Sequence, residues 1–196
     1  MKNTVLSIAA ALALLLPAAC GKKAPKIIES GTAASGDPGY KFKLTVDKLQ
    51  FDWKVNGQYL DVKLKAPVQA WLAAGFNPAD GMQGANMIIG TFDSGKPVVT
   101  DQYGIDPKHH KEDTELGGKD DVMKAAGQQT AAGTEVSFSI PLNSGDRTDN
   151  VIDPASVTLM LAYGKTDETA QKHPFWAEAH LNLNTGAYEL NLKKEE

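Results

Sequence analysis

Residues 71–103, WLAAGFNPADGMQGANMIIGTFDSGKPVVTDQY, read as strand, loop, strand, turn and strand. The strands are expected at 70–76, 87–92 and 96–103, where apolar residues with high β propensity gather. Breaker residues predict the loop at 77–81 and the turn at Ser94-Gly95. Met82 lies on a glycine-flanked corner of this loop. It is either a gap-filler at the end of the fold or a ligand.

Alternating segments on both sides predict further strands. Residues 40–64 alternate around Asn56-Gly57, which is the strongest short signal for a β-hairpin. Later strands are expected at 135–142, 156–163, 177–183 and 187–192. About nine to eleven short strands separated by turns predict an all-β fold, an antiparallel immunoglobulin-like sandwich.

The long polar segment 105–133 shows no clear periodicity. Its high charge predicts an exposed loop, with one short helix near 122–126.

The N-terminus predicts export. Residues 1–19 read as a signal peptide, because Lys2 precedes an apolar run that is too short to span a membrane comfortably. Cys20, the only cysteine, lies at the cleavage point, which resembles a bacterial lipoprotein signal in which that cysteine carries the lipid. The alternative is ordinary cleavage near Ala19, which leaves a free thiol. Either way the protein is expected in the cell envelope, facing the periplasm or the cell surface, and lipidation would add a membrane anchor.

The mature chain is expected to comprise a tether and one domain. Residues 20–39 are rich in Lys, Gly, Ala, Ser and Pro, which predicts a flexible tether. Residues 40–196 have the usual size of a single domain. The formal net charge is -4, and Arg147 is the only arginine, so no nucleic-acid partner is expected. No nucleophilic, phosphate-binding or zinc motif stands out, and the chain is therefore not expected to be an enzyme.

The order of these segments resembles the DOMON family, sandwiches that bind haem b or sugars and include the cytochrome domain of cellobiose dehydrogenase. The similarity covers roughly residues 49–192. It rests on an opening hairpin that contains Trp53, a third strand at 71–76, a Met-bearing loop and strand at 82–90, the Val99-x-Asp101-x-Tyr103 pattern, and residues 162–167 followed by His173.

The resemblance implies a haem site. In haem-binding members, one Met and one His ligate the iron from opposite faces, and Met82 and His173 match those two positions. The two loops are expected to meet at one end of the sandwich. Protein ligands in both axial positions suit electron transfer. No Cys-x-x-Cys-His motif occurs, so the haem would be non-covalent haem b. The expected apolar wall comprises Trp71, Phe76, Phe175 and Trp176.

Other residues weaken or compete with this interpretation. Asn86 stands where related loops often have an acidic residue, and Lys172 stands where an aromatic residue often precedes the histidine. His180 is the alternative histidine ligand. The adjacent His109 and His110 are expected in a solvated acidic loop, which could dock a positively charged redox partner. Two further methionines, Met87 and Met160, are expected to pack within strands.

The sequence therefore predicts an exported, lipid-anchored haem b protein that exchanges electrons with a redox partner protein in the envelope. One alternative is a non-haem DOMON module that holds a sugar or another small ligand, with stacking by Trp71, Phe175 and Trp176. A second alternative is a structural lipoprotein that only contacts other proteins.

Overall fold

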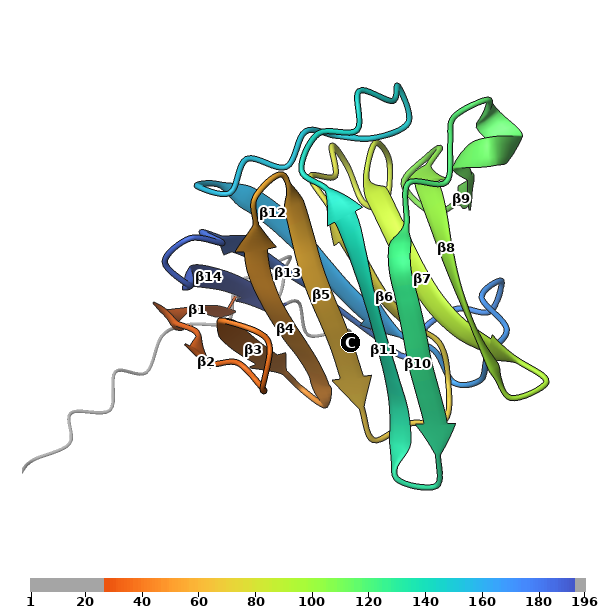
Figure 1. Cartoon of the computed structure of the whole chain (residues 1–196), viewed down its shortest axis with the longest axis horizontal. Coiled ribbons are helices and arrows are strands. Elements are labelled where there is room, and N and C mark those ends of the chain that lie inside the picture. Colours follow the sequence, from red (N-terminus) through yellow and green to blue (C-terminus); the bar gives the residue numbers. More distant parts are fainter. Residues whose placement is uncertain (1–26, 193–196) are drawn as a thin grey trace, which may run out of the picture.

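The chain folds into two antiparallel sheets packed face to face, in a computed structural model that describes residues 27–192 (Figure 1). The predicted all-β sandwich is confirmed. The larger sheet has the order β1-β14-β13-β12-β6-β7-β8-β9. Its strands are β1 (Ile27–Thr32), β14 (Ala187–Leu192), β13 (Phe175–Leu181), β12 (Val157–Tyr163), β6 (Leu72–Phe76), β7 (Asn86–Asp93), β8 (Lys96–Gly104) and β9 (His110–Glu112).

The smaller sheet has the order β10-β11-β5-β4-β3-β2. Its strands are β10 (Met123–Thr130), β11 (Gly133–Pro141), β5 (Tyr59–Ala66), β4 (Leu49–Asn56), β3 (Phe42–Val46) and β2 (Ala34–Ser35). Asn56 and Tyr59 pair across the Asn56-Gly57 turn, which confirms the predicted hairpin. Among the described residues, no helix is long and apolar enough to cross a lipid bilayer.

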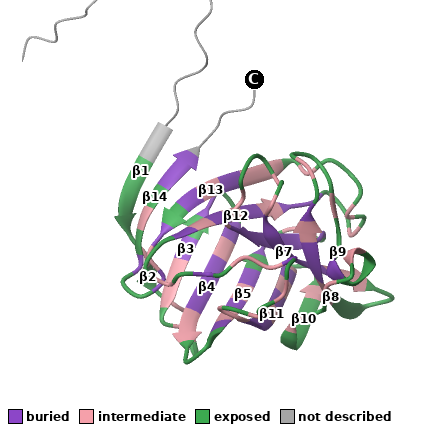
Figure 2. Cartoon of the chain, turned by 90° about the horizontal axis from the view of Figure 1, so that it is seen from above, coloured by how far each residue is buried: buried purple, intermediate pink, exposed green. Residues whose placement is uncertain are grey.

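The core lies between the sheets and follows the alternation of side chains along each strand. Trp53, Phe51 and Phe76 are its largest fully buried side chains. Trp53 donates its indole N–H to the carbonyl of Leu183, 3.0 Å away, so its polar atom is satisfied inside the core. Along β5, buried residues alternate with half-buried or exposed ones (Figure 2).

Three segments differ from the sequence prediction. Residues 123–130 form strand β10 rather than a loop with a helix, because its backbone pairs with β11 although its side chains are nearly all exposed (Figure 2). A short 3-10 helix, η1 (Asp113–Leu116), follows β9. Residues 27–35, expected within a flexible tether, instead form β1, which pairs with β14, and β2, which pairs with β3. The signal peptide and Cys20 lie outside the described residues.

Candidate functional site

The two loops expected to hold a cofactor begin at opposite ends of the larger sheet (Figure 1). The loop with Met82 joins β6 to β7 where Phe76 pairs with Asn86. The loop with His173 leaves β12 after Tyr163, which pairs with Leu72 at the other end of β6. The two loops therefore leave the sheet from opposite ends rather than from one end, as the sequence predicted. They can approach each other only by folding over the same face of the sheet.

His173 lies against that face through Trp71. Its imidazole packs edge-on against the Trp71 indole, with ring centroids 6.1 Å apart and planes at 88°. Trp71 is fixed in turn, because its indole N–H donates to the carbonyl of Glu168 at 3.2 Å. Its ring also packs closely on Gly164, where a Cβ would come within 2.3 Å of the indole nitrogen. The histidine ring is thus oriented by a buried, hydrogen-bonded tryptophan.

The Met82 loop is anchored mainly through its backbone. The Met82 N–H donates to the carbonyl of Pro107 at 3.2 Å, and its carbonyl accepts from Ala85 at 3.1 Å. Gly104 lies so close that a Cβ there would be 1.6 Å from the Met82 carbonyl oxygen. The Asn150 amide, from the loop before β12, donates to the carbonyls of Asn77 at 3.1 Å and of Gly84. These contacts hold the loop's path, and the Met82 side chain is half-buried.

Between the two loops, the outer face of the larger sheet is apolar. Trp71, Ala73 and Ile89 are buried in a small cluster separate from the main core, with Ala162 packed beside them. Gly75 lies at the centre of the next row, where a Cβ would be 3.4 Å from Met160 and 3.5 Å from Met87. We call this surface the apolar strip; it comprises Ala73, Gly75, Met87, Ile89, Met160 and Ala162.

The apolar strip has small residues in the middle and larger ones at its margins. Ala73, Gly75, Met87 and Ile89 are buried in this structure, so a flat apolar ligand could reach the backbone of β6 only if the side chains that cover the strip move aside.

A second histidine borders the same face. The His110 ring lies 2.5 Å from the side-chain oxygen of Gln102, which pairs with Met87 across β7 and β8. Burial lowers the pKa of His110, and positive charge on His109 and then on His173 lowers it further. His110 is thus not the solvated residue that the sequence predicted. His109 is solvent-exposed as predicted, and its ring lies 2.7 Å from the Asp106 carboxylate.

The four predicted wall residues divide between the two faces of the sheet. Trp71 lies beside the apolar strip, and Trp176 pairs with Ala162 of that strip. Phe76 instead is fully buried in the main core, and Phe175 stacks on Tyr163 with ring centroids 5.0 Å apart. Because neighbouring strand residues face opposite ways, Phe76 and Phe175 stabilise the sandwich rather than line the outer face.

The sequence interpretation missed Met87, Met160 and His110. Met160 is half-buried on the outer face, not in the core, and Met87 shares that face with Ile89. The apolar runs around them hid which face each side chain takes, because both phases of the alternation are apolar. The alternative ligand His180 is exposed, and its ring lies 3.1 Å from the Thr158 hydroxyl.

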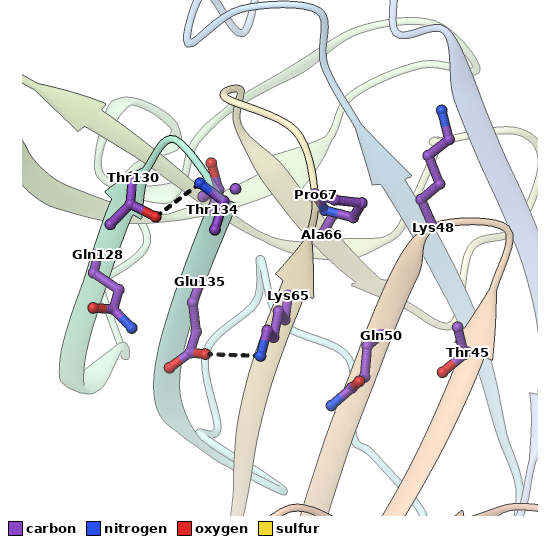
Figure 3. A pocket seen from close by; sticks show the side chains of 12 residues that line it. Thr45, Lys48, Gln50, Lys65, Ala66, Pro67, Gln128, Thr130, Thr134 and Glu135 are labelled. Atoms are coloured by element: carbon purple, nitrogen blue, oxygen red, sulfur yellow. Dashed lines mark hydrogen bonds and ion pairs between the residues drawn. The ribbon is translucent and has the colours of Figure 1, made fainter.

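An open hollow of about 300 Å³ lies on the smaller sheet (Figure 3), whereas the apolar strip lies on the larger one. Its lining includes the polar side chains of Gln50, Lys65, Gln128 and Glu135. Lys65 and Glu135 pair across the hollow at 4.0 Å. No aromatic side chain lines it, so it lacks the stacking surface expected for a sugar.

Comparison with known proteins gives a consistent result. A family model described as the DOMON domain matches residues 45–164. DBH-like monooxygenase protein 1 of Mus musculus is 23% identical over 168 residues, which cover 83% of this chain and 26% of that protein. The Homo sapiens protein of the same name is 23% identical over 141 residues, 70% of this chain and 22% of its own length. The chain thus spans about a quarter of the length of these relatives.

Two solved structures are similar to this one. The cytochrome domain of Myriococcum thermophilum cellobiose dehydrogenase has a TM-score of 0.51 at 9% identity, covering 87% of this chain and 90% of that domain. The cytochrome b domain of pyranose dehydrogenase from Coprinopsis cinerea has a TM-score of 0.47 at 11% identity, covering 73% and 76%. The first likeness shows a shared fold.

Proposed function

Because the chain belongs to the DOMON family, we propose that it is an electron-transfer protein that binds a non-covalent haem b against the apolar strip. The observation that carries the proposal is the His173 ring, which Trp71 holds at the edge of a flat apolar surface. The fold shared with a cytochrome domain supports it. Oxidation and reduction of the haem iron by one electron would supply the chemistry.

His173 and Met82 are the proposed axial ligands. The Met82 loop begins after Phe76, and the His173 loop begins after Tyr163, which pairs with Leu72. Leu72 and Phe76 are four residues apart, or about 13 Å along the strand. Each loop would therefore reach over the apolar strip from its own end to bind one iron. Met87 is the competing thioether, since it already lies on that strip next to Gly75. Imidazole and thioether together suit an iron that exchanges electrons and leave no open position.

The protein side chains would serve three purposes at this site. Trp71, held by its hydrogen bond to the Glu168 carbonyl, packs against the His173 ring and would keep this ligand in place. Ala73, Gly75 and Ala162 give a flat floor, and the surrounding larger side chains keep water from it. The low polarity of this floor favours the less charged, reduced state of the iron.

The haem proposal is tested by spectroscopy of the full chain expressed with haem supply. We expect sharp reduced-state bands from a six-coordinate iron, and His173→Ala should abolish them. His180→Ala is the matched control, because its ring is exposed and lies 3.1 Å from the Thr158 hydroxyl, outside the apolar strip. A colourless protein that takes up no added haem would refute the proposal.

Three methionine variants identify the second ligand. Met82→Leu should change the reduced-state bands and lower the reduction potential, because it removes the thioether without removing the volume. Met123→Leu, the same exchange at an exposed position on β10 of the smaller sheet, should leave both unchanged. If Met87→Leu alone has the effect, haem binding stands and the ligand is Met87 rather than Met82.

We also propose that the protein is exported and anchored to the membrane through lipid on Cys20, where it would meet a redox partner protein. This rests on the sequence of residues 1–20 alone. A Cys20→Ser variant should move the protein from the membrane fraction to the soluble extract of the envelope. A protein that stays with the membrane after this change would contradict lipid anchoring.

A further inference from the structure

Three aspartates converge at the edge of the sandwich, on the opposite side of β8 from the apolar strip. Asp101 comes from β8, Asp113 from η1, and Asp149 from the loop before β12. One carboxylate oxygen of each lies within 4.8 Å of those of the other two. Asp121, at the entry to β10, adds a fourth carboxylate, and its backbone N–H donates to Asp101 at 3.0 Å.

These carboxylates are withdrawn from water. Asp113 is fully buried and Asp101 is 4% exposed, which is rare for aspartate unless it is paired. Neither carboxylate oxygen of Asp113 has a hydrogen-bond partner, and one oxygen each of Asp101, Asp121 and Asp149 lacks one too. Buried polar atoms are nearly always hydrogen-bonded, so five such atoms at one place indicate a missing partner.

Nothing in the described part of the chain neutralises this group. Among residues 27–192, no lysine, arginine or histidine forms an ion pair with Asp101, Asp113 or Asp149. Several negative charges cannot share a buried site without a counter-charge.

We propose that Asp101, Asp113 and Asp149 bind a calcium ion, with Asp121 at its rim. The ligands are all oxygens, which favours a hard cation over zinc, copper or iron, whose sites use imidazole or thiolate. The carboxylates come from three separate segments and offer several oxygens in an irregular arrangement. This suits the flexible coordination by 6–8 oxygens of Ca²⁺ better than the strict octahedron of Mg²⁺.

The surroundings provide further oxygens and an approach. The Asn86 side-chain oxygen is also buried without a hydrogen-bond partner. It lies on the inner face of β7, diagonal to Asp101 in the register with β8. An open hollow of about 280 Å³ is lined by Asp120, Asp121 and Ser144. Ser144 also donates to Asp149 at 2.5 Å, so this hollow borders the cluster.

The site can be tested by calcium titration of the full chain after treatment with a chelator, without added haem. We expect one Ca²⁺ per chain by calorimetry and elemental analysis. The unfolding temperature should rise with free Ca²⁺ above the dissociation constant, since the ion binds only the folded state. Mg²⁺ at the same concentration should give a clearly smaller rise.

Two isosteric variants and one control assign the ligands. Asp113→Asn and Asp149→Asn should each weaken Ca²⁺ binding by at least about tenfold. Glu115→Gln removes the same charge from the same 3-10 turn but at an exposed position, so it should leave the affinity unchanged. The proposal is overturned if the wild-type chain shows neither heat nor a temperature shift with millimolar Ca²⁺. Undiminished binding by both aspartate variants, or a preference for Mg²⁺, would also overturn it.

Discussion

The two faces of the β7–β8 ribbon carry opposite chemistry. On the outer face, Met87 and Ile89 lie among small apolar residues, and Gln102 and His110 form the polar margin. On the inner face at the same edge, Asp101 joins a buried group of carboxylates. Because consecutive strand residues face opposite ways, Asp101 and Gln102 belong to different sites. One pair of strands can therefore supply a surface for a flat apolar ligand and a cage for a hard cation.

The largest expected effect is a loss of stability when a side chain on the inner face of the larger sheet is truncated, compared with one on its outer face. Phe76→Ala removes a fully buried ring from the main core and should lower the free energy of unfolding by about 3–5 kcal/mol. Trp176→Ala, on the outer face, should cost less stability but weaken haem binding. Urea unfolding and haem titration of the two variants check this. If Trp176→Ala is the more destabilising change and Phe76→Ala the more harmful to haem binding, our division of the faces is wrong.

A smaller effect is expected at the Met82 loop. In Gly104→Ala, the new methyl group would overlap the Met82 carbonyl, so the loop must shift, at a cost of about 1–3 kcal/mol. If Met82 is an iron ligand, the reduced-state haem bands should change as well. Gly75→Ala is the stability control, because its methyl group would meet its nearest neighbours at 3.4 Å, an ordinary contact. Unfolding curves that do not distinguish the two variants would count against the anchoring role of Gly104.

The smallest expected effect concerns Asp37, a carboxylate that forms ion pairs with Lys43 and Lys63. The hydrogen bond from Lys63 at 2.8 Å, with Lys43 at 3.3 Å, lowers the pKa of Asp37 to about 2. As the pH falls, Asp37 is therefore protonated in the unfolded chain before it is protonated in the folded one. The stabilisation is present above pH 4 or so and is lost as the pH falls through about 2.

Acid unfolding of Asp37→Asn tests this difference. The wild type should lose stability relative to the variant between about pH 4 and pH 2, by less than about 1 kcal/mol because water screens the pairs. The aspartates of the proposed calcium site act in the opposite direction when no cation is bound, because burial raises the pKa of Asp101 to about 8. A difference between wild type and variant that does not change with pH would contradict the role of Lys63.

The sequence was informative where one phase of the alternation is polar. The hairpin around Asn56-Gly57 was predictable because Leu60, Val62 and Leu64 alternate with polar residues and face the core. Strand β10 was not predictable, because nearly all of its side chains are exposed and its sequence shows no alternation of apolar and polar residues. Only its backbone pairing with β11 defines it as a strand. In β7 both phases are apolar, so the sequence could not indicate that Met87 faces outward.

The proposed haem site and the aspartate cluster also differed in how far the sequence indicated them. Met82 and His173 were found through resemblance to a family, and their assignment as ligands stays a prediction. The aspartate cluster was unpredictable, because Asp101, Asp113 and Asp149 are distant in the sequence and Asp113 lies among other acidic residues of a polar segment. Only the packing of η1 and the loop before β12 against β8 brings them together. The signal that could have raised attention is Asp101, a charged residue inside a strand.

The pairing of β1 with β14 has a consequence for how the chain folds. Ile27 pairs with Leu192, so the first described strand can enter the sheet only after the last has been made. Contacts of such long sequence separation form slowly, whereas the hairpin of β4 and β5 is local and can form early. The larger sheet therefore closes last, and its edge at β14 stays open to other chains until β1 covers it. A chain that lacks β1 should aggregate while it folds, even though β1 lies far from the apolar strip and the acidic cluster.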